Sequence, residues 1–249
     1  MDLKGTVSIV TGGNGGLGRT ICDALAREGS NVAVVYKASK DDAEGVASAL
    51  QRYDVRATAY QADVTNLEDI QSLYQRVLAD YGQIDILVNN AAYNQSIAFS
   101  DLEGLTPDVW NHILHANATG PFLCSRAIAP IMKRQGRGRI VNVSSVAGFT
   151  PSGSSIAYAV SKSALNHLTR CLAVALAPEI IVNCVAPGLM EGTRMTTRLV
   201  PAQVKRAMET AALQKAADKE DVAAQVVTFC KTESITGQTM VIDAGRFYH

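Results

Sequence analysis

Neither charge is in excess in this 249-residue sequence, since Lys and Arg together number 23 and Asp and Glu also number 23. Proteins that bind nucleic acid or an anionic membrane through their overall field carry a surplus of basic residues. The balance therefore supports neither class of partner. A local basic cluster, Lys133, Arg134, Arg137 and Arg139, falls in a glycine-containing turn, where a solvated loop accounts for it.

Long hydrophobic runs are also absent. No stretch approaches the roughly 20 apolar residues of a membrane-spanning helix, and residues 1–6 lack the apolar core of a secretory signal. The five cysteines are odd in number and scattered, with no C-x-x-C pair: Cys22, Cys124, Cys171, Cys184 and Cys230. This spacing does not indicate a disulfide framework, so we predict reduced, buried thiols and a cytoplasmic location.

Linkers, low-complexity tracts and internal repeats are missing as well. With 47% hydrophobic residues the chain has enough apolar material for one large core, and single α/β domains commonly reach this length. We therefore predict one domain over 1–249. No metal site is expected, because His112 and His115 alone provide too few ligands.

The sequence does contain a repeated alternation of β-branched runs and helical periodicity. Strands are expected at 7–10, 31–36, 56–61, 84–89, 139–143, 180–185 and 238–242. Helices are expected at 17–28, 41–52, 65–81, 107–134, 157–175 and 218–231, with a capping box from Thr65 to Glu68 opening the third. Continuous apolar strands are typical of parallel sheets covered on both faces. The predicted fold class is α/β, a single-domain Rossmann-type doubly wound parallel sheet of about seven strands with helices on both faces.

A glycine-rich turn, Thr11 to Gly18, joins the first expected strand to the first expected helix. In this arrangement the amides at the helix start and the helix dipole meet a pyrophosphate, which side chains would keep at a distance. A flexible loop would have the same composition, but the position directly after the first strand favours dinucleotide binding.

Tyr158 and Lys162 stand four residues apart in an expected helix, and Ser145 precedes the tyrosine by thirteen positions. Residues at i and i+4 share one helix face, so the ammonium would lie beside the phenol. A positive charge about 4 Å away would lower the pKa of tyrosine by about 3 units and permit proton exchange with an alcohol or ketone oxygen. Ser145 would hold that oxygen by a hydrogen bond. Alone, a pair at this spacing also fits an ordinary surface contact.

Together with further motifs, these segments resemble the short-chain dehydrogenase/reductase family over essentially the whole chain. The matching pieces are Thr11-Gly-x-x-x-Gly16-x-Gly18, Asp63-Val64, Asn89-Asn-Ala-Ala92, Asn117, Val143-Ser-Ser145, Tyr158-x-x-x-Lys162 and Pro187-Gly188. Within the family the chain is most similar in character to 3-oxoacyl-carrier-protein reductases and related ketone reductases. The resemblance implies an NAD(P)-dependent oxidoreductase that interconverts a ketone and a secondary alcohol.

The resemblance also assigns roles to four residues. Tyr158 is implied as the general acid/base, Lys162 as the group that lowers its pKa and holds the nicotinamide ribose, and Ser145 as the group that positions the substrate oxygen. Asn117 is implied as the anchor of a water in a proton relay, although it also fits a residue that supports an irregular helix. The implied cofactor-binding residues are Gly12, Asn14, Gly16, Leu17, Gly18, Tyr36, Lys37, Asp63, Val64, Asn90, Ala91, Ala92, Tyr158, Lys162, Pro187 and Gly188.

The choice of nucleotide depends on the end of the second strand, where a carboxylate would repel a 2′-phosphate. The segment Tyr36 to Lys40 has Lys37 and Ser39, and no acid precedes Asp41. Charge logic therefore favours NADP(H) over NAD(H). An exposed lysine that only aids solubility would leave an NAD-dependent secondary alcohol dehydrogenase as the alternative.

Residues 189–213 form the expected substrate lid, with Met190, Met195 and Met208 as an adaptable apolar wall. Tyr93 to Gln95 is the expected opposite wall. The helices at 107–134 and 157–175 are apolar on more than one face, so we predict a homo-oligomer, by resemblance a tetramer, with a small-molecule substrate as the other partner. A catalytically silent dinucleotide-binding module is the alternative from another class.

Overall fold

The computed structural model describes residues 1–193 and 201–248 of the chain. The strands are β1 Val7–Thr11, β2 Asn31–Tyr36, β3 Ala57–Gln61, β4 Ile86–Asn89, β5 Gly138–Val143, β6 Ile180–Pro187 and β7 Thr239–Ile242. They pair in parallel as one seven-stranded sheet in the order β3-β2-β1-β4-β5-β6-β7. This confirms the doubly wound α/β fold expected from the sequence.

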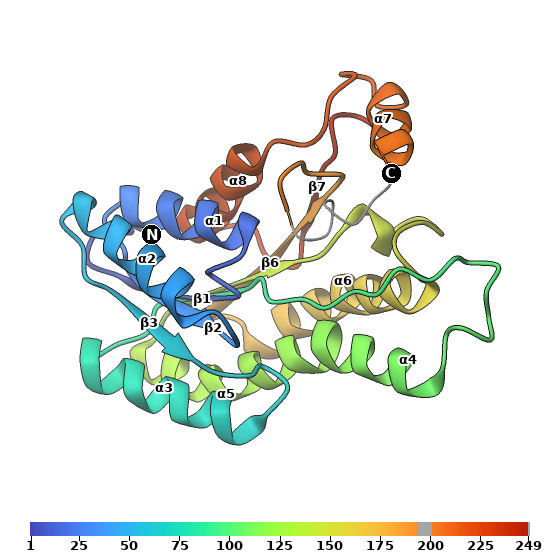
Figure 1. Cartoon of the computed structure of the whole chain (residues 1–249). Coiled ribbons are helices and arrows are strands. Elements are labelled where there is room, and N and C mark those ends of the chain that lie inside the picture. The colour runs from blue at the N-terminus through green and yellow to red at the C-terminus, as the bar shows by residue number, and fades with distance from the viewer. Residues whose placement is uncertain (194–200, 249) are drawn as a thin grey trace.

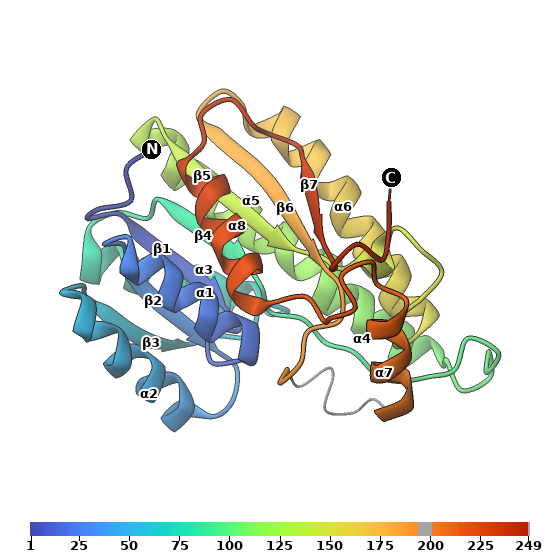
Figure 2. The same cartoon turned by 90° about the horizontal axis from the view of Figure 1, so that it is seen from above.

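Helices cover both faces of the sheet (Figures 1 and 2). Their bounds are α1 Gly16–Arg27, α2 Lys40–Leu50, α3 Leu67–Tyr81, α4 Pro107–Leu114, α5 Gly120–Gln135, α6 Ile156–Leu176, α7 Pro201–Glu209 and α8 Lys219–Lys231. The side chains of α1, α2 and α8 pack in one buried apolar cluster, and those of α3, α5 and α6 pack in a second one on the other face.

Alternate residues of the central strands enter opposite clusters. Val10 and Val34 belong to the cluster under α1, α2 and α8, whereas Ile9 and Val35 belong to the cluster under α3, α5 and α6. Because side chains alternate across a sheet, a strand covered on both faces is apolar at every position. This is the physical reason for the continuous apolar runs in the sequence.

The strand order determines where the ligand crevice lies. The first strand, β1, lies between β2 and β4, so the chain winds toward β3 on one side and toward β7 on the other. In open parallel sheets, ligands bind outside the carboxyl ends of the strands at such a switch point. The glycine turn after β1 and Asn90 after β4 both lie there.

The long helix expected at 107–134 is interrupted. α4 ends at Leu114, a π-helical turn covers His115–Thr119, and α5 begins at Gly120. Proline has no N–H, so Pro121 cannot donate the α-helical hydrogen bond to the carbonyl of Asn117. The irregularity therefore falls on a residue that the sequence singled out for the site.

The start of α3 also differs from the prediction. The helix is capped by Asn66, whose Oδ1 accepts hydrogen bonds from the N–H groups of Glu68 at 2.8 Å and Asp69 at 3.1 Å. The expectation that Thr65 is the cap was wrong. Its hydroxyl instead donates to Asp63 Oδ1 at 2.6 Å, because the loop before the helix turns this side chain toward the end of β3.

Two predictions about single side chains were wrong. Arg139 does not lie in a solvated turn but is buried in β5, where its guanidinium donates to the carbonyl of Cys230 and the carboxylate of Glu233. Four of the cysteines are buried as expected, but Cys171 is exposed on α6. Its position on the outer face of the helix, away from the sheet, is the reason.

The expected lid contains α7, which the sequence analysis did not separate from it. Residues 194–200 of the expected lid, Met195 among them, lie outside the described residues. Across the ranges that the structure describes, no helix has the length and apolarity needed to cross a membrane. The same ranges contain no group of three or more His, Cys, Asp or Glu side chains placed to hold a metal ion.

Candidate active site

The glycine turn forms a close-packed cradle at the carboxyl end of β1. Gly12 has a φ of +63°, and a Cβ there would lie 3.1 Å from the Cα of Ala91. A Cβ on Gly18 would lie 2.2 Å from the carbonyl oxygen of Gly12, so no side chain fits. Leu17 is buried beneath the turn. These contacts explain why small residues are required where a nucleotide backbone would approach.

The start of α1 suits an anion. The N-cap, Gly15, makes no side-chain capping bond, and the first turn of the helix, which begins at Gly16, contains no acidic residue. The N–H groups of the first turn and the positive end of the helix dipole therefore face the crevice without a carboxylate in the way. A dinucleotide pyrophosphate fits this position.

Asn14 connects the glycine turn to the end of the second strand. Its Nδ2 donates to the carbonyl of Ala38 at 3.0 Å, and its own carbonyl accepts from Arg19 Nε at 2.9 Å. Arg19 in turn pairs with Asp42 at the start of α2, with N and O 3.3 Å apart. The side chain of Asn14 therefore fixes the turn where the adenosine end of a nucleotide is expected.

Two residues expected to meet different parts of the nucleotide are paired with each other. Lys37 Nζ lies 2.6 Å from Asp63 Oδ2, next to Tyr36, which is buried at the end of β2. Partial burial raises the pKa of Asp63, but the hydrogen bonds from Lys37 and Thr65 outweigh it and hold the pKa below its usual value. The carboxylate therefore stays charged, and Lys37 is held at the rim of the crevice. Val64 follows and packs against the core.

The segment after β4 is fastened to β1. Thr11 Oγ1 accepts hydrogen bonds from the N–H groups of Asn90 and Ala91, each at 3.0 Å. Asn90 Nδ2 donates to the carbonyl of Thr11 at 2.8 Å and to that of Gly12 at 3.1 Å. This network orders Asn90 to Ala92 along the wall of the crevice. This role of the Thr11 hydroxyl was not predicted from the sequence.

Ser145, Tyr158 and Lys162 meet where β5 ends against α6. The hydroxyl of Ser145 is hydrogen-bonded to the phenol of Tyr158, and Lys162 Nζ lies 5.8 Å from the centroid of the Tyr158 ring. Ser155 caps α6 by accepting a hydrogen bond from the N–H of Tyr158 at 3.2 Å. The predicted clustering of the three side chains is therefore found in the structure.

Lys162 is fixed to the end of β5 at two points. Its ammonium donates to the carbonyl of Val143 at 2.8 Å, and its own carbonyl accepts from the hydroxyl of Ser144 at 3.0 Å. Of the two adjacent serines, Ser144 therefore has the structural role, because its hydroxyl holds the backbone of Lys162. Its neighbour Ser145 faces the phenol, as the spacing predicted.

The predicted lowering of the Tyr158 pKa was wrong. Burial raises the pKa of Tyr158 to about 12, although the hydrogen bond from Ser145 opposes this shift. Burial also lowers the pKa of Lys162 to about 8. The Lys162 ammonium lies over the ring and donates to a backbone carbonyl, so its charge is not held against the phenolic oxygen. The phenol therefore keeps its proton at neutral pH.

Asn117 lies in the π-helical turn and is fully buried. Its Oδ1 accepts from the N–H of Tyr93 at 2.8 Å, and its Nδ2 donates to the carbonyl of Tyr93 at 2.9 Å and to the hydroxyl of Ser161 at 3.0 Å. Ser161 also donates to the carbonyl of Tyr158 at 2.7 Å. The side chain of Asn117 therefore links the segment after β4 to α6. Ser161, three residues after Tyr158, is a site residue that the sequence analysis missed.

Below the site, a buried polar ladder joins the sheet to α6. Asn89 Nδ2 donates to Asn142 Oδ1 at 2.9 Å, and Asn142 Nδ2 donates to Thr169 Oγ1 at 2.9 Å. Buried polar groups that are fully paired favour one arrangement of the elements that carry them. Only Asn89 was noted in the sequence, within the motif after the fourth strand.

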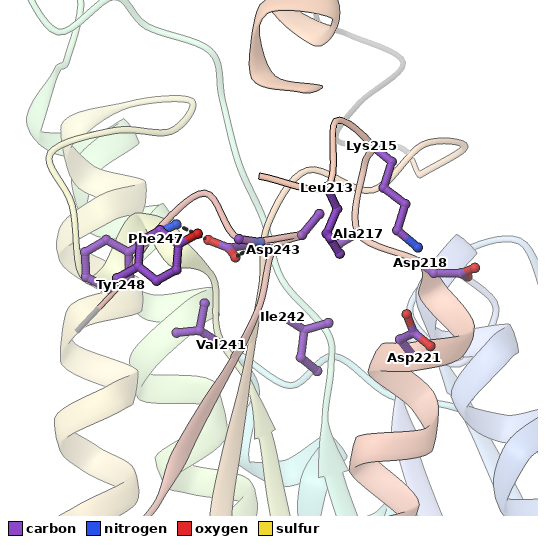
Figure 3. A pocket seen from close by; sticks show the side chains of 12 residues that line it. Leu213, Lys215, Ala217, Asp218, Asp221, Val241, Ile242, Asp243, Phe247 and Tyr248 are labelled. Atoms are coloured by element: carbon purple, nitrogen blue, oxygen red, sulfur yellow. Dashed lines mark hydrogen bonds between the residues drawn. The ribbon is translucent and has the colours of Figure 1, made fainter. Parts of the chain in front are cut away.

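Pro187 and Gly188 lie at the end of β6, across the crevice from the glycine turn. Thr193 is buried, and its hydroxyl donates to the carbonyl of Met190 at 3.4 Å. His112 makes an edge-on contact with the ring of Tyr93, with centroids 4.4 Å apart. A cavity of about 450 Å³ lies beside β7 and the start of α8, with Asp243 and Phe247 among its lining residues (Figure 3).

Comparison with known proteins agrees with this geometry. The family model described as short chain dehydrogenase matches residues 6–204. A Streptomyces violaceoruber protein named as a ketoacyl reductase of the granaticin polyketide synthase is 38% identical over 96% of this chain and 95% of its own length.

Two solved structures have the same fold. The structure of NAD⁺-bound xylitol dehydrogenase matches with a TM-score of 0.92 and 29% identity, covering 98% of this chain and 100% of that one. NADPH-dependent 3-quinuclidinone reductase from Rhodotorula rubra matches with a TM-score of 0.90 and 27% identity, covering 98% and 92%. The chain belongs to the short-chain dehydrogenase/reductase family, whose members are oxidoreductases acting on CH–OH and C=O groups.

Proposed function

We propose that this chain catalyses the NADPH-dependent reduction of a ketone to a secondary alcohol, or the reverse, through Asn117, Ser145, Tyr158 and Lys162. The observation that carries the proposal is the Tyr158 phenol, hydrogen-bonded by Ser145 and covered by Lys162 at the edge of the nucleotide crevice. The ketoacyl reductase named among the relatives supports a carbonyl compound as the substrate.

The side chains divide the chemistry among them. When bound, the nicotinamide supplies the hydride for the carbonyl carbon. Tyr158, kept protonated by a pKa of about 12, donates its proton to the carbonyl oxygen as negative charge develops there. Ser145 holds the same oxygen by a hydrogen bond. Lys162 places a positive charge over the ring of Tyr158 rather than against its oxygen, and Asn117 keeps the Tyr93 segment in place against α6.

The test of this assignment is the variant Tyr158→Phe, which removes only the phenolic oxygen. The variant should bind NADPH as the parent does and lose ketone reduction by about 10²–10⁴-fold, the usual contribution of a positioned acid. Initial rates followed at the nicotinamide absorbance, with nucleotide binding by fluorescence titration, measure both. Parent-like turnover would show that Tyr158 is not the acid.

The same experiment separates the alternative function, a catalytically silent dinucleotide-binding module. A silent module has no need of the Ser145–Tyr158 hydrogen bond, and it would bind NADPH with no turnover in the parent on any panel of ketones and alcohols. The complete set of four polar side chains favours the enzyme.

For the nucleotide we propose NADP(H) over NAD(H). Lys37 directly follows β2, which ends without a carboxylate, and this suits a 2′-phosphate; its ammonium also pairs with Asp63, which follows β3, with Nζ and Oδ2 2.6 Å apart. Both an NADPH-dependent reductase and an NAD⁺-bound dehydrogenase occur among the similar structures, so their names do not distinguish the two.

The variant Lys37→Ala tests this choice. We expect it to lower kcat/KM for NADPH by about fivefold, the loss of one exposed charge contact of about 1 kcal/mol, and to leave NADH within about twofold. The matched control is Lys40→Ala, a nearby lysine at the start of α2 that pairs with Glu44. A parent enzyme that turns over faster with NADH would refute the assignment.

We further propose that residues 189–213 act as the substrate lid, that the whole chain is one catalytic domain and that the protein works as a cytoplasmic homotetramer. Exposed apolar side chains on the outer faces of α5 and α6, namely Phe122, Val160 and Val174, support a second copy as the partner. Cell fractionation that places the protein outside the cytoplasm would contradict the location.

A further inference from the structure

The last strand ends in a turn that a single carboxylate holds together. Asp243 is buried, and its Oδ1 accepts hydrogen bonds from the N–H groups of Gly245 at 2.9 Å and Arg246 at 3.1 Å, while Oδ2 accepts from that of Phe247 at 2.7 Å (Figure 3). Ala244 has a φ of +59°, which residues with side chains seldom adopt. The carboxylate thus fixes the direction in which the C-terminal tail leaves the sheet.

This turn packs against the crevice on one side and the lid on the other. The N–H of Gly188 donates to the carbonyl of Ile242 at 2.8 Å, and a Cβ on Gly188 would lie 2.7 Å from the Cβ of Asp243. The N–H of Ala212, at the end of the lid, donates to the carbonyl of Gly245 at 3.1 Å. The start of the tail is therefore part of the wall that surrounds the crevice.

The tail then reaches the loop that carries Ser145. The rings of Phe247 and Phe149 stack with centroids 5.5 Å apart and an interplanar angle of 28°. Phe149 follows Ser145 by four residues, and the same loop turns back over Tyr158, because a Cβ on Gly153 would lie 3.3 Å from the tyrosine ring. The stacked pair therefore stands at the rim of the site in which Tyr158 would act.

We propose that the C-terminal tail supplies a wall of the substrate site, where Phe247, stacked on Phe149, selects carbonyl compounds that carry an aromatic or similarly flat apolar substituent. The inference rests on the proposed function, since it names the substrate class of the same site. Aromatic side chains offer large apolar faces that prefer offset or edge contacts with another ring. Asp243 is a positioning residue, because its carboxylate accepts the N–H of Phe247 and so holds this ring against Phe149.

Two methyl ketones test the wall, 2-butanone and 4-phenyl-2-butanone, which share the reacting group and differ by one phenyl ring. Phe247→Ala should lower kcat/KM for the phenyl ketone by about tenfold and for 2-butanone by less than about twofold, because only the larger ketone loses an apolar contact. Phe247→Leu should restore part of the loss. The matched control is Tyr248→Ala, the next residue of the tail and a largely exposed one, which should leave the ratio of the two ketones unchanged.

An equal loss for both ketones in Phe247→Ala would overturn the proposal, as would an equal change in ratio in Tyr248→Ala. If Phe247→Ala does not fold by circular dichroism, Phe247→Leu and Phe149→Leu carry the same comparison, with a loss confined to the phenyl ketone as the supporting result. If the parent reduces neither ketone, neither of them is its substrate, and the panel of ketones and alcohols remains the test of the proposed function. Saturation-transfer NMR of 4-phenyl-2-butanone with NADPH present then tests whether Phe247 forms the wall. Loss of the phenyl signal in Phe247→Ala supports the proposal, and an unchanged signal refutes it.

Discussion

Lys162 shows how a single buried charge links chemistry to stability. The residue is 2% exposed, and its ammonium donates to the Val143 carbonyl at 2.8 Å. Burial lowers its pKa from 10.5 to about 8, so the folded chain releases this proton at a lower pH than the unfolded chain does. Between those values the unfolded chain binds more protons, and the free energy of unfolding therefore rises with pH across that window. Below pH 8 the buried charge costs stability.

The variant Lys162→Met removes this charge and keeps a side chain of similar shape. We expect the free energy of unfolding at pH 7 to increase by about 2 kcal/mol, the relieved burial of charge less one hydrogen bond, while ketone reduction is lost. Urea unfolding at pH 7, 9 and 10 measures the effect. If the free energies of unfolding of parent and variant differ by the same amount at all three pH values, the assigned pKa is wrong.

At the residue scale, spacing in the sequence predicted which side chains meet but not how they titrate. Tyr158 and Lys162 lie on one helix face because they are four residues apart, and the structure has them together. The direction of the Tyr158 pKa shift was wrong, because burial and the orientation of the ammonium are decided by packing. The pairing of Lys37 with Asp63 was likewise invisible, since it joins the ends of two strands.

At the scale of elements, helices and strands were predicted well where local signals act alone. The second strand has the predicted bounds, and α6 differs from the prediction by one residue at each end. The sequence analysis expected one helix over 107–134 because the apolar periodicity is continuous on both sides of Asn117, but its alternative for Asn117, a residue that supports an irregular helix, agrees with the π-helical turn found there. The proline at position 121 was the available signal, since it removes a donor from the α-helical ladder.

The cap of α3 gives a prediction at this scale. Asn66→Ala should lower the free energy of unfolding by about 1 kcal/mol, because two N–H groups of the first turn lose their acceptor. The control is Ser39→Ala at the start of α2, where the side chain makes no capping bond, so stability should change by less than about 0.5 kcal/mol. Chemical denaturation compares the two, and equal losses would show that the Asn66 bonds do not stabilise the helix.

The whole molecule presents an apolar surface that no described element covers. Val174 is 83% exposed on α6, and Phe122 on α5 and Val160 on α6 are each exposed by two fifths or more. Burial of such side chains against a second copy would stabilise an assembly by about 25 cal/mol per Å² of apolar area. We therefore expect the protein to associate through α5 and α6.

A charge placed on this face tests the association. Val174→Asp should shift the light-scattering mass at micromolar concentration from an oligomer toward a smaller species, since a carboxylate would have to lose its water in the contact. Leu102→Asp also places an acid at an exposed apolar position, but in the loop before α4, and should leave the mass unchanged. A parent protein that is monomeric at this concentration would exclude the proposed tetramer.

The sequence by itself determined the alternation of strands and helices, the glycine turn and the spacing that gathers Ser145, Tyr158 and Lys162, because these depend on neighbours within a few turns of chain. Only the tertiary structure decided the contacts between segments that are distant in sequence. These are the Lys37–Asp63 pair, the hydrogen bonds from Asn117 to Tyr93 and Ser161, and the contact of the C-terminal tail with Phe149. Their partners are brought together by the strand order, and burial there sets the pKa of each group. Local sequence patterns carry no information on the strand order or on how burial shifts a pKa.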